Sequence, residues 1–203
     1  MAARIGGSPK IGFGSTPLLL QLVHGSLNAV SVSASGARID GLPPVELTGT
    51  LRDVHLRSLT GLEGAIGSLS VDVRLPASGV RDLLATPSCV GSLPANVLAA
   101  LTPTPRVALF AGRIDLLPPR GRAAEVRLRP LAAGNSVRFT PIGLELAGVP
   151  SSAAQLDALR AQTRCSRTLS DLPFGISLSS AQADPGALEL SFAGTGASFS
   201  AVG

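Results

Sequence analysis

Apolar and polar residues alternate with a period of two along much of this chain, a pattern typical of strands with one buried face. Residues 69–75 show it most cleanly, because Leu or Val stands at every second position until Pro76 ends the run. The alternation changes phase at Arg52 and Asp53, which we interpret as a β-bulge. Further strands are expected at residues 26–39, 47–56, 107–111, 114–117, 125–128, 137–139, 142–146, 176–180, 188–192 and 197–201.

Besides an apolar half-helix within residues 11–25, three further short helices are expected between the strands, each beginning at a residue that suits a helix N-terminus. They are a helix at residues 79–85 capped by Ser78, one at 95–101 opened by Pro94, and one at 153–163 capped by Ser151 or Ser152. Most connections are as short as hairpin loops, which favours an antiparallel sheet over alternating β-α-β units. The pattern therefore predicts an α+β fold, with a single domain spanning residues 1–203.

The segment at residues 11–25 is expected to contain a short helix that leads into the strand at residues 26–39. It is unusually apolar on all sides, since Gln21 is the only polar residue between Leu18 and Val23. It is too short to span a bilayer, which takes roughly 20 apolar residues. An ordinary surface helix carries a single apolar stripe and a polar opposite face. We therefore expect this segment to be buried on several sides or to face something apolar that is not protein.

The order of residues in and after this segment follows a family pattern. The matching positions are Phe13, Pro17, Leu18, Leu19, Gln21, Leu22, Gly25, Leu27, Val30 and Val32, with a second match at residues 172–178 and a turn at residues 184–186. They resemble the LmeA family of actinobacterial phospholipid-binding proteins. The chain departs from the family's usual sequence motif at residues 14–16, and Leu18 stands where the family has a second aromatic residue.

This resemblance implies a strongly curved antiparallel sheet wrapped around a few helices, similar to the tubular lipid-binding, BPI-like fold, with an apolar cavity. It also implies an exported protein, periplasmic or associated with the cell envelope. We expect that an export or anchor segment has been removed ahead of Met1. The expected partners are phospholipid, anionic in its head group, and a membrane surface.

Apolar residues on the expected helices are the candidates for lining such a cavity. Only 15% of the residues are charged, which indicates either an internal apolar surface or a compositional bias toward Ala, Leu and Val. Close packing alone favours a solid core, whereas the resemblance favours a cavity. The candidates are Leu18, Leu19, Leu22, Val23, Leu83, Leu84, Val97, Leu98, Leu101, Leu156 and Leu159.

Positive charge is concentrated at residues 106–138. This stretch contains seven arginines and two acidic residues, a net charge of +5 compared with +4 for the whole chain. Arg120 and Arg122 lie in an expected Pro- and Gly-rich turn. They are candidates for contact with anionic head groups or a membrane surface; the alternative is a solvated hairpin face. Nucleic acid is not expected as a partner, because the chain has no Tyr or Trp for base stacking.

Cys89 and Cys165 are the only cysteines, and their isolated spacing argues against a zinc site. In an exported protein they are expected to form a disulfide; two buried free thiols are the alternative. His24 and His55 are expected to be structural or surface residues. The carboxylates are scattered and no nucleophile, phosphate-loop or metal motif is present, so we expect no enzyme activity, metal or cofactor.

The sequence thus favours non-catalytic binding, and possible transfer, of phospholipid in the cell envelope, with acyl chains in the cavity and anionic head groups near basic loops. A solid-core scaffold or protein-interaction domain is the alternative hypothesis, and an enzyme with an unrecognised site is the third. Bound lipid would separate the first from the second, and turnover would separate the third.

Overall fold

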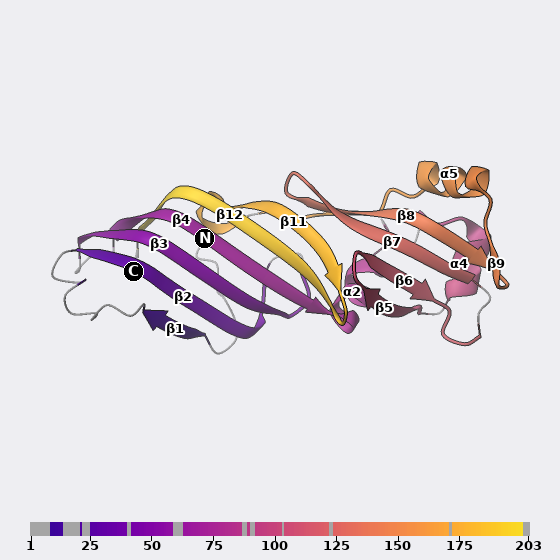
Figure 1. The fold of residues 1–203 in the computed structure, drawn as a ribbon, viewed down its shortest axis with the longest axis horizontal. Coiled ribbons are helices and arrows are strands. Elements are labelled where there is room, and N and C mark those ends of the chain that lie inside the picture. The colour runs from indigo at the N-terminus through magenta and orange to yellow at the C-terminus, as the bar shows by residue number, and fades with distance from the viewer. Residues whose placement is uncertain are drawn as a thin grey trace.

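The computed structural model describes residues 9–13, 21, 25–39, 42–58, 63–86, 89, 92–102, 104–121, 124–170 and 172–200. Two antiparallel sheets, A and B, lie end to end along the long axis of the molecule (Figure 1). Neither sheet closes into a barrel in the described part of the chain. The predicted antiparallel α+β architecture is confirmed.

Sheet A contains both chain-terminal strands of the described residues. Its order is β1 (Lys10–Phe13), β2 (Ser26–Ala37), β3 (Val45–Ser58), β4 (Glu63–Pro76), β12 (Ala187–Ser200) and β11 (Ser177–Asp184). Sheet B has the order β10 (Ser166–Thr168), β8 (Ser136–Leu146), β7 (Ala124–Ala133), β6 (Arg113–Leu117) and β5 (Arg106–Phe110), and β9 (Val149–Pro150) pairs with β8.

The predicted strands are confirmed, with two mergers. Residues 137–139 and 142–146 belong to one strand, β8. Residues 188–192 and the described part of the predicted strand 197–201, residues 197–200, belong to one long strand, β12. β1, β9 and β10 were not predicted, because two to four residues are too few to show a period.

The helices are α2 (Ala77–Leu84), α4 (Ala95–Leu101), α5 (Ala153–Gln162) and the short 3₁₀ helix η1 (Pro173–Gly175). The capping prediction for α5 is confirmed. The Ser152 hydroxyl accepts a hydrogen bond from the Gln155 backbone N–H, and the Gln155 side chain accepts one from the Ser152 N–H. The Ser78 cap was wrong: α2 begins at Ala77 directly after Pro76, whose extended backbone ends β4, and no side chain caps it. Pro94 is the N-cap of α4.

The predicted phase change at Asp53 is confirmed, but its interpretation as a bulge was wrong. No residue is inserted there, because β2, β3, β4 and β12 keep the same register on both sides. Instead, the opposed residues Asn28, Asp53, Gly67 and Gly196 form one row across the four strands, which we call the crossover row. Asp53 and Gly196 have positive φ angles of 53° and 65°. In all four strands, therefore, the alternation of inward-facing and outward-facing side chains changes phase at this row.

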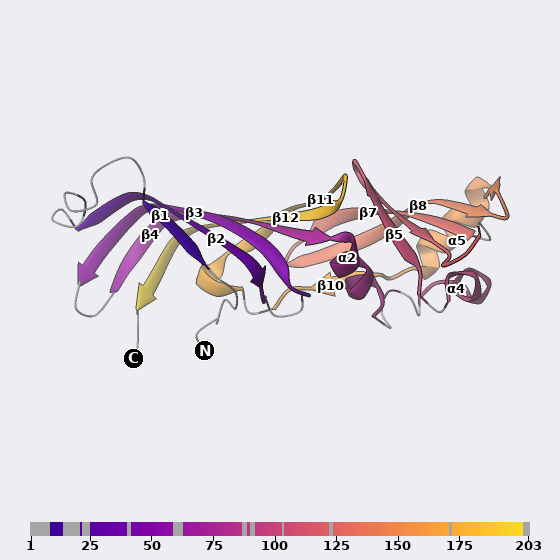
Figure 2. The same ribbon diagram turned by 90° about the horizontal axis from the view of Figure 1, so that it is seen from below.

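The two sheets meet where the hairpin turns of sheet B reach β11. The Gly112 N–H donates to the Ala183 carbonyl (2.7 Å), and the Leu178 N–H donates to the Asn135 side-chain oxygen (3.3 Å). One continuous cluster of buried apolar side chains runs through both sheets. α2 and α4 lie on one side of the strands (Figure 2). We call the apolar face of each sheet its inner face and the opposite face its outer face.

Candidate lipid-binding face

The inner face of sheet A is an apolar surface built from strand alternation in register. Opposed residues on antiparallel strands point to the same side, so each row across the sheet continues the same surface. Small residues are interspersed with larger ones, so the side chains rise less far above the sheet at some positions, such as Gly49, than at others. Three central rows are Ala34–Leu47–Val73–Leu190, Val32–Gly49–Val71–Phe192 and Val30–Leu51–Leu69–Gly194.

The crossover row lets this apolar face continue toward the far end of sheet A. Beyond it the inward-facing row is Leu27–Val54–Ile66–Ala197, and all four side chains are buried. Without the change of phase, strict alternation after Leu51 would turn Val54 to the outer face. The row thus keeps one continuous apolar surface on a sheet whose strands change phase.

This inner face is incompletely covered, and its exposed margin lies at edge strand β1. Ile11 and Phe13 pair with Val32 and Val30 and therefore share their side of the sheet. Yet Ile11 is 60% exposed and Phe13 is 44% exposed. Across the next three strands of this face, Val32, Leu51 and Val71 are only partly buried.

The opposite margin of the same face is covered by the segment that leads into β11. A Cβ added at Gly194 would lie 2.9 Å from the Ile176 side chain, so this segment presses directly on β12. Phe174, two residues earlier, has a φ of 57° and a side chain that is 47% exposed. A strained backbone at an exposed aromatic residue is costly and marks a position for functional study.

The inner face of sheet B is closed by comparison. Ile114, Val126 and Val137 are 0% exposed. α2 supplies Leu84 against this face, where a small hollow with a volume of about 10 Å³ is lined with Leu116, Leu128 and the disulfide. That volume is near the minimum for one water molecule and cannot hold an acyl chain.

Most of the described cavity candidates lie in this closed core. Leu83, Leu84, Val97, Leu101 and Leu159 are at most 3% exposed, whereas Leu98 and Leu156 are partly buried against the same core. Of the helices that carry them, α4 and α5 pack on sheet B, whereas α2 lies at the junction and contacts β5 of sheet B as well as β4 and β12 of sheet A. Whether any of them meets ligand remains a prediction. Leu18, Leu19, Leu22 and Val23 lie outside the described residues, whereas their neighbour Gln21 is buried and its side-chain oxygen accepts a hydrogen bond from the Asn28 N–H.

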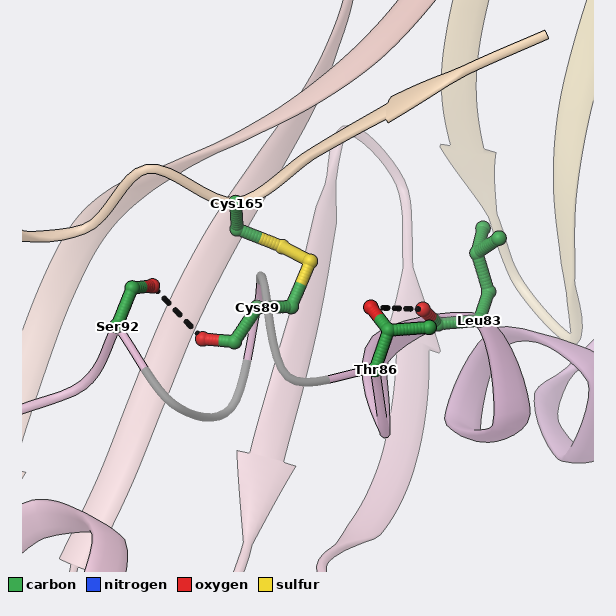
Figure 3. Close-up of a disulfide and its surroundings, with 5 residues drawn as sticks. All are labelled: Leu83, Thr86, Cys89, Ser92 and Cys165. Atoms are coloured by element: carbon green, nitrogen blue, oxygen red, sulfur yellow. Dashed lines mark hydrogen bonds between the residues drawn. A yellow bond between two sulfur atoms is a disulfide. The ribbon is translucent and has the colours of Figure 1, made fainter.

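The predicted disulfide between Cys89 and Cys165 is confirmed. It ties the segment after α2 to the segment between α5 and β10 (Figure 3). The Ser92 hydroxyl donates to the Cys89 carbonyl (2.8 Å), and the Thr86 hydroxyl donates to the Leu83 carbonyl near the end of α2 (3.3 Å). The disulfide therefore locks the covering layer of sheet B in place.

A second hollow lies at the far end of sheet A, with a volume of about 230 Å³. Its lining mixes charged and apolar groups, including Arg57, Glu63 and Phe199. Phe199 packs over Gly64, where any Cβ would meet the phenyl ring at 2.5 Å. This hollow is therefore adjacent to the end of the apolar inner face.

The outer face of sheet B carries a charge cluster that the sequence did not predict. Arg127 bonds to Glu125 (2.6 Å) and Glu145 (3.3 Å), and the Arg113 Nε lies 3.2 Å from the Asp115 carboxylate. Asp115 is 4% exposed, and its burial raises the pKa of the carboxyl group, although the nearby Arg113 acts in the opposite direction. The alignment between these two side chains is too poor for a hydrogen bond. Sequence alternation places Asp115 on the outer face but does not show that it is buried there.

Arg120 is exposed in the loop after β6, at the end of that strand opposite the Gly112 turn, and Arg122 lies outside the described residues. Arg120 is therefore remote from the junction with sheet A. Its contact with head groups remains a prediction.

The described part of the chain offers little support for a metal site, a histidine site or a membrane-spanning helix. No three His, Cys, Asp or Glu side chains there converge as metal ligands. Of the two histidines, His55 is exposed on β3, and His24 lies outside the described residues. None of the helices described has the length and apolar character needed to cross a membrane.

A family model described as LmeA-like phospholipid-binding matches residues 3–193, nearly the whole chain. The chain belongs to this family of phospholipid-binding proteins. Comparison with curated proteins and with solved structures gave no match.

Proposed function

We propose that this protein binds phospholipid with the acyl chains against the inner face of sheet A, where they enter over the β1 margin. It is exported and transfers phospholipid within the cell envelope. The observation that carries this proposal is the contrast between the two inner faces. Sheet B buries its apolar residues under helices, whereas sheet A leaves Ile11 and Phe13 exposed on β1, beside the partly buried Val32 on β2. The family membership supplies the ligand class.

The energetics of acyl chains favour exchange over storage. Moving a CH₂ group from water into an apolar site gains about 0.8 kcal/mol. A chain that leaves a bilayer is already in hydrocarbon, so its transfer to an apolar protein face changes the free energy little. Such a face can accept a lipid from one membrane and release it to another, which suits a carrier or chaperone.

Filling the low centre of the inner face tests the assignment. A Cβ at Gly49 would lie 3.4 Å from the Ser70 carbonyl and 3.5 Å from Val71, which are ordinary contacts, so Gly49→Leu fits the backbone and projects into the proposed lipid space. Thr48→Leu adds a similar side chain to the outer face one residue away and is the matched control.

Native mass spectrometry of gently purified protein then reports bound lipid, and thermal unfolding reports the fold. We expect bound phospholipid in the parent protein and in Thr48→Leu, and at least a tenfold lower lipid occupancy in Gly49→Leu with the melting temperature retained. Equal lipid occupancy in both folded variants would move the acyl chains away from this face. A parent protein that carries and takes up no lipid would favour a scaffold with a solid core.

A further inference from the structure

The outer face of sheet B divides into an acidic end and a basic, apolar end. Pairing of Phe110 with Arg113, and of Leu131 with Arg138, places these four side chains on the outer face. Arg129 lies two residues before Leu131 on the same strand and so shares this face. We call these five residues the β5–β8 patch.

The arginines of this patch are available to a partner. Arg129 and Arg138 are exposed and form no hydrogen bond or ion pair with any residue that the structure describes. By contrast, the neighbouring Arg127 is held by Glu125 and Glu145 at the other end of the face. The positive charge of the patch is therefore only partly neutralised, by Asp115 at Arg113.

Two large apolar side chains flank these charges. Phe110 is 44% exposed and Leu131 is 45% exposed. The Arg113 guanidinium lies 4.7 Å from the centre of the Phe110 ring, which holds the ring beside the charge on the surface. Exposed apolar groups among cations suit an interface between water and lipid, where aromatic rings lie at head-group level and arginines meet anionic phosphates.

The patch also adjoins sheet A. The Gly112 turn next to Phe110 bonds to Ala183, and Asn135, in the turn between Leu131 and Arg138, bonds to Leu178. A contact made here holds sheet A close to whatever surface the patch meets.

We propose that the β5–β8 patch docks the protein on a bilayer surface bearing anionic phospholipids. This inference rests on the proposed function for its purpose, because docking holds sheet A, which adjoins the patch through β11, near a source of lipid. The occupant follows from charge complementarity together with the exposed Phe110 and Leu131.

Vesicle co-sedimentation at low ionic strength tests the docking. Vesicles of phosphatidylcholine mixed with phosphatidylglycerol are compared with vesicles of phosphatidylcholine alone. Arg129→Gln with Arg138→Gln removes two patch charges. Arg38→Gln with Arg52→Gln removes two exposed charges on or beside sheet A and is the control for net charge.

At about 1 kcal/mol per charge near an anionic surface, the patch variant should bind the mixed vesicles about 25-fold more weakly, and the control should lose far less. Phe110→Ser with Leu131→Ser should weaken binding to the mixed vesicles without changing net charge. Circular dichroism melting checks that each variant is folded.

Equal losses in the patch and control variants, unchanged binding in both patch variants, or equal binding to both vesicle types would overturn the docking site. Lipid occupancy by native mass spectrometry keeps this result separate from the proposed function. Folded patch variants that lose vesicle binding yet load lipid from detergent solution support docking as a separate step. Failure of the parent protein to load lipid rejects the proposed function, whatever the vesicles show.

Discussion

A Cβ placed on Gly67 would lie only 2.8 Å from the Cβ of Asp53 on the neighbouring strand. The two residues oppose each other in the crossover row, and Asp53 has a left-handed backbone with a φ of 53°. Real Cβ atoms do not approach this closely, so the row requires glycine in β4 opposite the turned-over residue in β3. The close approach thus connects the phase change in one strand to the residue type in the next.

Gly67→Ala should therefore destabilise the protein, by about 1–3 kcal/mol, because β3 and β4 must separate locally. Asp53→Gly removes the opposing Cβ and suits the left-handed backbone, so alone it should change stability little. The double variant should regain most of the loss. Urea unfolding of the four proteins measures the coupling, and simple additivity would contradict the contact.

Gly49→Ala is the matched control on the neighbouring strand, because its added Cβ meets only ordinary contacts. It should cost clearly less than Gly67→Ala. Equal losses would indicate that any alanine weakens these strands and that the crossover row is not special.

Asp115 should make the folded protein more stable as the pH falls, whereas an aspartate held by a salt bridge makes it less stable. Its pKa is raised in the folded protein by burial, so the folded state binds the proton more tightly than the unfolded state. The wild type should therefore gain stability relative to Asp115→Asn as the pH falls from neutral toward 3.8, the ordinary value, and lose that advantage as the pH rises.

Unfolding free energies of the two proteins across this pH range provide the measurement. Asp72→Asn, at an exposed position on sheet A, is the control for loss of a carboxylate. A relative stability of Asp115→Asn that improves on acidification would show that the ion pair with Arg113 outweighs the burial of the carboxylate.

Replacing both Cys89 and Cys165 by Ser should lower the free energy of unfolding, by up to about 4–5 kcal/mol in the loop-entropy model for residues 76 positions apart. The loss arises because the unfolded chain regains freedom. Denaturant unfolding of oxidised, reduced and doubly substituted protein compares the three forms. Thiol titration of the denatured, unreduced wild type should find no free thiol, and two free thiols would contradict the disulfide.

Much of the strand layout could be predicted because alternation is a local signal that survives folding. The phase change at Asp53 was visible because Leu51 and Val54 are three residues apart. That the partner strands change phase in the same row could not be predicted, because it depends on register between distant segments. The same limit explains Asp115, which alternation places outward and tertiary packing buries.

The ligand class was predicted from the sequence, and the cavity candidates were placed on the expected helices, where their contact with ligand stays a prediction. Apolar helices signal burial, and nothing in their sequence shows which sheet they cover. In the structure α2, α4 and the disulfide close the inner face of sheet B, whereas the exposed apolar margin lies on β1, a strand of four residues too short to be recognised. The placement of a lipid face therefore depends on which sheet each helix covers.

A tryptophan placed on each inner face distinguishes the two locations for acyl chains. Leu98→Trp in α4 enlarges a side chain packed against the core of sheet B, and Val71→Trp enlarges one on the partly open inner face of sheet A. In a closed core such overpacking typically costs about 1–3 kcal/mol, whereas on an open face the ring occupies space that a ligand would fill. Val71→Trp should keep or raise the melting temperature of the lipid-free protein and lower lipid occupancy, and Leu98→Trp should lower the melting temperature while the folded fraction still carries lipid. The reverse pattern, with lipid lost only in a stable Leu98→Trp protein, would place the acyl chains among the helices and remove them from sheet A.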